Sequence, residues 1–103
     1  ELRNGYARRP MPDSSAPLNS TSALAGLRVL DLSTVLAGPN CAKYLGDFGA
    51  DVIKVEQPGV GDSLRNMAWR DPRDGDSMWW KIIGRNKRTV ALNLKSESDR
   101  EVF

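Results

Sequence analysis

The residues best suited to chemistry in this sequence are cations and glycines that together could hold an anion. The stretch KIIGRNKRTVALNLK, residues 81–95, carries no acid and five cations, namely Lys81, Arg85, Lys87, Arg88 and Lys95. Glycines occur in STVLAGP at 33–39 and in EQPGVGD at 56–62. Glycine lets a backbone approach a ligand closely, and cationic side chains bind phosphate oxygens. The simplest ligand for this combination is a nucleotide.

Composition disfavours several other kinds of chemistry. The 103 residues contain no histidine, which removes the commonest general base and metal ligand. Cys41 is the single cysteine, so it has no internal disulfide partner, which suits a reducing, cytoplasmic compartment. A zinc site would have only Cys41 and carboxylates, so we expect no metal. The net charge of +2 and the lack of a long apolar run predict neither a nucleic-acid nor a membrane partner.

The first half of the chain predicts a tail followed by a strand–helix–strand unit. Residues 1–23 are rich in Pro, Ser, Asn and Arg, which predicts a disordered linker or tail. Apolar residues at 27–33 predict a strand, and PNCAKYLGDFGA predicts a helix from Pro39 to about Gly49 with Cys41 on its apolar stripe. DVIKVE at 51–56 predicts a second, parallel strand.

The second half predicts two more elements. Residues 76–84 read as a short helix capped by Asp76, and residues 88–94 as a third strand with Val90, Leu92 and Leu94 on one face. Ser96 and Asp99 then resemble a capping box that starts a helix, so we expect the chain to be truncated. The order of elements predicts an α/β fold with a Rossmann-like βαβ unit and a mainly parallel sheet.

Ligands of an open parallel sheet bind beyond the carboxyl ends of its strands. Lys95 follows the third predicted strand, which makes it the better phosphate partner. Residues 85–88 precede that strand, whose length is roughly 20 Å, so we expect them to contact another loop or subunit unless they form a solvated basic edge. Glu56 stands where a ribose-binding acid would, but Gly-x-Gly-x-x-Gly is absent, which disfavours NAD.

From Leu24 onward the sequence strongly resembles the amino-terminal segment of class III CoA-transferases of the CaiB/BaiF type. This is the family of formyl-CoA transferase, carnitine CoA-transferase and alpha-methylacyl-CoA racemase. The motifs LAGLRVLDLSTVLAGP, LGDFGADVIKVEQPGVGD and NKRTVALNLKS carry the resemblance in the family's order and spacing. It implies that residues 24–103 are the amino-terminal part of a Rossmann-like large domain that acts on coenzyme A. It also implies acyl-CoA and carboxylic acid substrates and an interlocked homodimer.

The resemblance places CoA contacts on seven residues of this chain: Leu36, Ala37, Gln57, Leu92, Asn93, Leu94 and Lys95. Many family members carry arginine at the position of Gln57, where arginine would hold a phosphate bidentately and glutamine supplies a neutral amide. The transferases' catalytic aspartate and the racemases' His/Asp pair lie beyond Phe103, so we expect no catalytic residue here and no activity of this chain alone. Three functions stay open: part of a CoA-transferase, part of a racemase, or a noncatalytic nucleotide-binding or interaction module.

Overall fold

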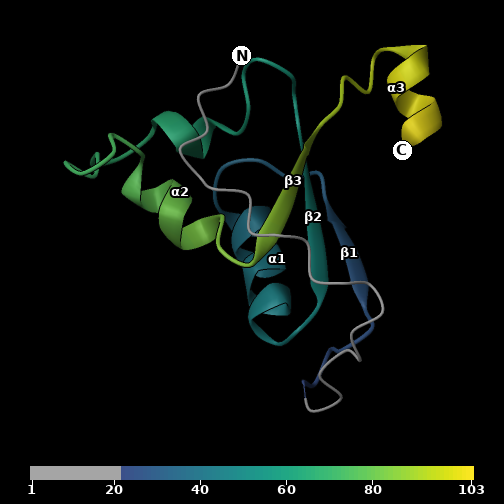
Figure 1. The fold of residues 1–103 in the computed structure, drawn as a ribbon, viewed down its shortest axis with the longest axis horizontal. Coiled ribbons are helices and arrows are strands. Elements are labelled where there is room, and N and C mark those ends of the chain that lie inside the picture. Colours follow the sequence, from purple (N-terminus) through teal and green to yellow (C-terminus); the bar gives the residue numbers. More distant parts are fainter. Residues whose placement is uncertain (1–21) are drawn as a thin grey trace.

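A three-stranded parallel sheet forms the centre of the computed structural model, which describes residues 22–103 (Figure 1). The strands are β1 (Arg28–Asp31), β2 (Asp51–Glu56) and β3 (Lys87–Ala91), and they lie side by side in the order β1-β2-β3. Both neighbouring pairs are parallel, with Ile53 of β2 opposite Leu30 on one side and Arg88 on the other. The predicted α/β fold with a parallel sheet is confirmed. The predicted tail lies outside the described residues except for its last two.

Helices connect and follow the strands. They are α1 (Ala37–Asp47) between β1 and β2, the short 3-10 helix η1 (Ser63–Asn66), α2 (Met78–Ile83) before β3, and α3 (Glu97–Val102) after it. Pro39 lies in the first turn of α1, where its missing N–H costs no hydrogen bond. At the other end Gly49, with φ of 101°, donates its N–H to the carbonyl oxygen of Gly46 at 3.0 Å and turns the chain toward β2.

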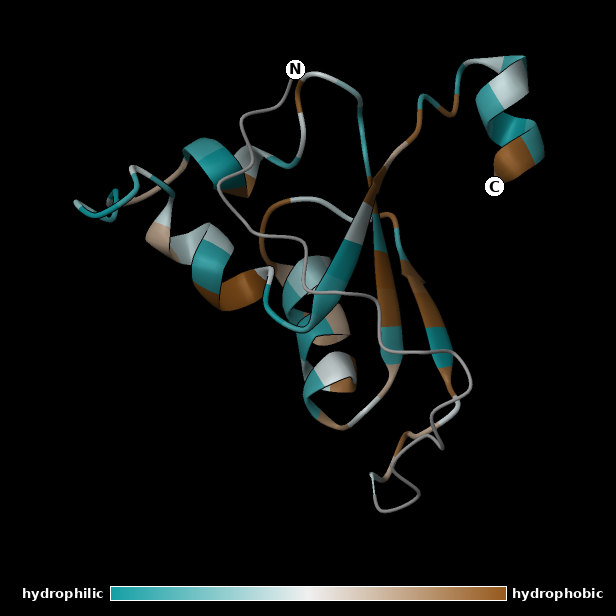
Figure 2. Cartoon of the chain, in the orientation of Figure 1, coloured by the Kyte–Doolittle hydropathy of each residue, from teal (hydrophilic) through white to brown (hydrophobic). Residues whose placement is uncertain are grey.

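One apolar cluster packs α1 against the sheet, and another joins η1 to α2. The first joins Ala42 of α1 to Ala50 and Val52, with Leu24, Val29 and Leu45 packed around them. The second joins Leu64 of η1 to Trp80 and Ile83 of α2, with Trp79 beside them. Figure 2 shows apolar residues along β1 and β2. On the sheet face opposite Val52, Leu30 is 46% exposed and Ile53 and Val55 are partly exposed, so the described residues leave this face largely uncovered.

Two strands are shorter than expected. β1 ends at Asp31 rather than residue 33, and β3 spans residues 87–91 rather than 88–94. The N–H of Leu92 still donates to the carbonyl oxygen of Glu56 at 3.0 Å, but Ser96 N–H then bonds to the carbonyl oxygen of Asn93 at 2.7 Å and closes a turn. Of the three residues predicted to share a strand face, Val90 is therefore the one within β3.

Two local predictions about the helices are wrong. Ser77 rather than Asp76 caps α2, because its hydroxyl oxygen accepts a hydrogen bond from the N–H of Trp80 at 3.2 Å. Cys41 is exposed, because α1 turns Ala42 rather than Cys41 toward the sheet. A free, exposed thiol without a histidine partner gives no catalytic arrangement in the described residues.

Replacing Leu64 by alanine should lower the free energy of unfolding by about 2–5 kcal/mol, because its side chain is fully buried and the smaller residue leaves a cavity. Urea denaturation followed by circular dichroism measures the change. Leu32→Ala is the matched control, because Leu32 is 48% exposed and its truncation removes much less buried surface. Equal losses in the two variants would contradict the cluster around Leu64.

Candidate functional site

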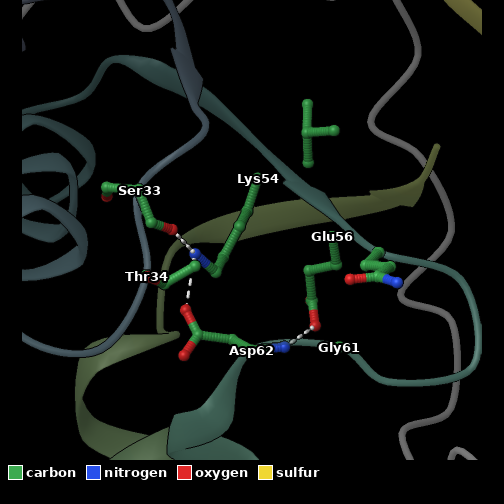
Figure 3. A pocket seen from close by; sticks show the side chains of 8 residues that line it. Ser33, Thr34, Lys54, Glu56, Gly61 and Asp62 are labelled. Carbon is green, nitrogen blue, oxygen red and sulfur yellow. Dashed lines mark hydrogen bonds and ion pairs between the residues drawn. The ribbon is translucent and has the colours of Figure 1, made fainter. Parts of the chain in front are cut away.

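Two hollows lie at the carboxyl ends of the strands. The first loop (residues 32–36, between β1 and α1) and the second loop (residues 57–62, between β2 and η1) enclose the edge cavity, whose volume is about 90 Å³ (Figure 3). Thr34, Gln57 and Gly61 line it together with buried charged side chains. The outer hollow, of about 230 Å³, lies on the other side of Gln57 and is also lined by Arg65, Arg70 and β3. Both hollows lie where ligands of parallel sheets bind.

A buried lysine lies at the centre of the edge cavity. Lys54 is on β2, and its side chain is 1% exposed. Its ammonium group donates to the carbonyl oxygen of Ser33 at 2.7 Å and lies 2.8 Å from Asp62 Oδ2, as Figure 3 shows. The same nitrogen lies 3.6 Å from Asp31 Oδ2. One cation of the central strand therefore contacts both loops and the end of β1.

A second buried lysine completes this charge cluster. The ammonium group of Lys87 lies 2.9 Å from Asp31 Oδ2 and donates to the carbonyl oxygen of Pro39 at 2.5 Å. Asp31 also accepts hydrogen bonds from the hydroxyl and N–H groups of Ser33. Two ammonium groups and the carboxylates of Asp31 and Asp62 thus balance each other in a region closed to solvent. Such an arrangement is stable only when each charge keeps its partner.

A carboxylate closes the second loop. Glu56 Oε2 accepts from the N–H of Asp62 at 2.9 Å, and both Glu56 oxygens accept from the Arg65 guanidinium at 2.7 Å. That guanidinium lies 3.6 Å from the ring centre of Trp80, a cation–π contact. Gly61 has φ of +70°, and a Cβ there would lie 2.8 Å from Glu56 Oε2. The second loop is therefore tightly closed, and Glu56 is not available to bind a ribose.

The carboxyl groups of the charge cluster are held ionised. Burial alone would raise the pKa of Asp31, but hydrogen bonds from Ser33 and Lys87 outweigh burial and hold this pKa below its ordinary value. Burial likewise opposes ionisation of Asp62, yet the N–H of Leu64 and the ammonium group of Lys54 keep its pKa below the ordinary range. Burial lowers the pKa of Lys87, and Asp31 offsets only part of that effect. A weakly basic, enclosed carboxylate is a poor nucleophile or general base.

The seven predicted contact residues all follow the carboxyl ends of the strands, and they form two separate groups. Leu36 precedes α1, Ala37 begins it, and Gln57 directly follows β2 and lines both hollows. Leu92, Asn93, Leu94 and Lys95 follow β3 and line neither hollow. They form a turn in which Asn93 N–H donates to Asp99 Oδ2 at 2.7 Å and Lys95 N–H to Asn93 Oδ1 at 3.1 Å. Their part in ligand binding stays a prediction.

The cations at the start of β3 and just before it pair with other elements of the same chain. Arg85 Nη2 lies 2.7 Å from Asp47 Oδ2 at the end of α1, and Arg88 Nη2 lies 2.6 Å from Asp51 Oδ2 at the start of β2. The hydrogen bond from Arg85 lowers the pKa of Asp47. The interpretation as a solvated basic edge is wrong for Lys87, whose side chain is fully buried. The predicted contact with another loop or subunit is replaced by ion pairs with the end of α1 and with strands β1 and β2.

The sequence reading missed Asp31, Lys54, Asp62 and Lys87 as a group. Asp31 is the last residue of β1, yet it is 4% exposed and bonded to Lys87. One signal was present: in DVIKVE, Lys54 stands two residues after Val52, so period-two alternation places both on the buried face. A lysine at such a position requires buried acidic partners.

The fold and the edge cavity define a Rossmann-like α/β domain that takes ligands at the carboxyl ends of parallel strands. The family model of CoA-transferase family III matches residues 24–103, and the chain therefore belongs to this family. CoA thioesters are the substrates of such enzymes. The predicted family resemblance is thus confirmed.

Several relatives are enzymes of known activity. The chain is 50% identical over 84 residues to the beta subunit of succinyl-CoA–L-malate CoA-transferase from Chloroflexus aurantiacus. This match covers 82% of this chain and 20% of that protein. It is 45% identical over 83 residues to formyl-CoA:oxalate CoA-transferase from Bradyrhizobium diazoefficiens. This match covers 81% of this chain and 19% of that protein. The chain thus spans about a fifth of the length of these relatives.

Solved structures show the same relation. A CaiB/BaiF family protein from Brucella suis superposes with a TM-score of 0.69 at 34% identity, over 79% of this chain and 22% of that one. A hypothetical protein from Mycobacterium tuberculosis superposes with a TM-score of 0.64 at 34% identity, over 75% of this chain and 20% of that one.

Within residues 22–103, no group of three or more His, Cys, Asp or Glu is arranged to hold a metal ion. The helices in that range are too short or too polar to cross a membrane.

Acid should destabilise the fold through the charge cluster. Because the folded-state pKa values of Asp31 and Asp62 lie below the ordinary value of 3.8, these groups stabilise the fold above that pH. This stabilisation is lost as the pH falls below about 4 toward the folded-state values. Urea denaturation at a series of pH values from 7 to 2 should show a nearly constant free energy of unfolding down to about pH 4 and a decline below it.

Asp62→Asn should make that decline shallower, because the variant has one fewer carboxyl group to protonate. Glu97→Gln controls for the loss of a negative charge, because Glu97 is an exposed residue at the start of α3. An acid decline of unchanged slope in Asp62→Asn would show that Asp62 does not contribute to it.

Proposed function

We propose that this chain is part of a CoA-transferase that moves CoA between an acyl-CoA and a carboxylic acid, and that it supplies part of the CoA-binding site. One observation carries the proposal: Gln57 lines a cavity formed by the first and second loops at the carboxyl edge of the sheet. The relatives named for their activity are transferases, which favours transfer over racemisation. We also propose that the enzyme is a cytoplasmic homodimer.

Three groups would contact CoA from different strand ends. The helix α1 has eleven residues, and the free N–H groups of its first turn, beginning at Ala37, favour a phosphate. Leu36, which is 42% exposed, offers apolar contact beside them. The amide of Gln57 offers a neutral hydrogen bond, and the exposed ammonium group of Lys95 offers a charge. Leu92, Asn93 and Leu94 would contact CoA from the turn that carries Lys95.

The described residues supply no catalytic group in this proposal. The buried carboxylates at the site already have cationic partners: Lys87 for Asp31, Arg65 for Glu56 and Lys54 for Asp62. A nucleophile that attacks a thioester must reach the carbonyl carbon, and these side chains are at most 7% exposed. The chain therefore binds and orients CoA, and the reacting carboxylate belongs to another part of the enzyme.

Binding of CoA to the purified chain, measured by isothermal titration calorimetry, tests the site. Lys95→Ala should weaken binding by about three- to tenfold, and Gln57→Arg should tighten it by about tenfold, because arginine adds a bidentate charged contact to phosphate. Arg28→Ala is the control, since Arg28 is exposed at the amino end of β1, away from the proposed site. No CoA binding, or equal losses in Lys95→Ala and Arg28→Ala, would contradict the proposal.

Activity separates binding from catalysis. The 103-residue chain alone should show no CoA transfer above background, because residues 22–103 supply no exposed carboxylate placed to attack a thioester in this proposal. A chimera of the Escherichia coli formyl-CoA:oxalate CoA-transferase, in which the matching 83 residues are replaced by those of this chain, should retain transfer at 44% identity. Measurable transfer by the isolated chain, recorded by separating CoA esters chromatographically, would refute this assignment.

A further inference from the structure

We propose that Lys54 and Asp62 are positioning residues that hold the first and second loops together. The loops at the carboxyl edge of the sheet are then already ordered before a ligand binds. The inference rests on the proposed function for its ligand, CoA. Neither residue is among the predicted contacts, and neither would touch the reacting atoms. Both act through the loops that carry Leu36 and Gln57.

The position of Lys54 within the sheet allows this role. It is on the central strand β2, opposite Asp31 of β1 and Thr89 of β3. From there its ammonium group reaches the first loop at the Ser33 carbonyl oxygen, 2.7 Å away, and the second loop at Asp62 Oδ2, 2.8 Å away. Asp62 also joins the loops directly, because its carboxylate accepts a hydrogen bond from the N–H of Val35. Removing the ammonium group would therefore leave that hydrogen bond without the ion pair beside it and weaken the attachment of the two loops.

Asp62 provides the second half of the contact. While Oδ2 faces Lys54, its other oxygen, Oδ1, accepts from the N–H of Val35 at 3.2 Å and of Leu64 at 2.9 Å. Val35 has φ of 67°, a conformation that a β-branched residue rarely adopts. Such a conformation persists only where the surroundings hold it. The hydrogen bond to Asp62 fixes Val35, which directly precedes Leu36 at the N-cap position of α1.

The chemical nature of the contact also points to positioning. Lys54 and Asp62 are each about 1% exposed, and apolar residues at such sites are often as stabilising as an ion pair. An ion pair constrains its two partners, because separating buried charges of opposite sign leaves each of them uncompensated. The two apolar clusters hold α1 and α2 in place elsewhere, and charges are buried where the two loops meet. Ordered loops reduce the entropy that a ligand must remove on binding.

The test uses Asp62→Asn, which keeps an oxygen for the Val35 and Leu64 N–H groups and removes the charge opposite Lys54. Hydrogen exchange by NMR should show at least tenfold faster exchange at Val35, with the β2–β3 amides unchanged. CoA affinity should fall by about tenfold. Asp47→Asn is the matched control, because it breaks the ion pair with Arg85 at the end of α1 and should change neither quantity.

A second variant guards against general destabilisation. Val35→Gly keeps every charge and removes the unfavourable side chain at positive φ, so its thermal midpoint should not fall. Its CoA affinity should still fall severalfold, because glycine leaves the first loop freer. In the Val35→Gly background, the further effect of Asp62→Asn on CoA affinity should be smaller than in the original chain.

The outcomes separate this inference from the proposed function. Unchanged hydrogen exchange at Val35 in Asp62→Asn would overturn the positioning role of Lys54 and Asp62. Faster exchange at Val35 would also overturn that role if CoA affinity were unchanged in both Asp62→Asn and Val35→Gly. If the original chain binds no CoA, the proposed function fails. The exchange at Val35 then still shows whether Lys54 and Asp62 hold the loops, because that measurement needs no ligand.

Discussion

The structure depends on one buried ammonium group. Lys54 is on the middle strand, and its partners belong to the end of β1 and to the two loops that follow β1 and β2. A buried charge without partners costs far more than a typical core contact stabilises. The strand ends must therefore adopt the arrangement that surrounds this nitrogen with oxygen atoms. The edge cavity is a direct consequence, since its walls are the segments that supply those oxygens.

The same principle explains the pairing of the cations around the start of β3. Lys87 extends to Asp31 and the Pro39 carbonyl oxygen, which ties β3 to the end of β1 and the first turn of α1. Arg85 and Arg88 pair with acids at the end of α1 and the start of β2. These cations stabilise contacts between elements far apart in sequence. In the proposed function, the attraction for an anion comes instead from α1 and Lys95 at the carboxyl ends of the strands.

The site combines rigid and open parts. Glu56, Arg65 and Asp62 close the second loop, and Asp62 holds the first loop at Val35. Gln57, Thr34 and Leu36 are left facing outward on loops whose backbones are fixed. This is the arrangement expected of a binding edge, in which burial and charge pairing keep the backbone ordered and the exposed side chains remain free for a ligand. It also explains why the enclosed carboxylates are unsuited to attack a thioester.

The sequence by itself determined the parallel βαβ order and the family, because strand and helix periodicity and short motifs are local properties. It also predicted a ligand at the carboxyl edge of the sheet. It did not reveal where β3 ends, since the turn at Asn93 overrides the continuing apolar alternation. Only the tertiary structure showed which buried charges pair. Lys54 meets Ser33 across 21 residues, and Lys87 meets Asp31 across 56. Such partners are chosen by strand register and loop path, because a charge is satisfied by whatever the fold brings within about 3 Å of it.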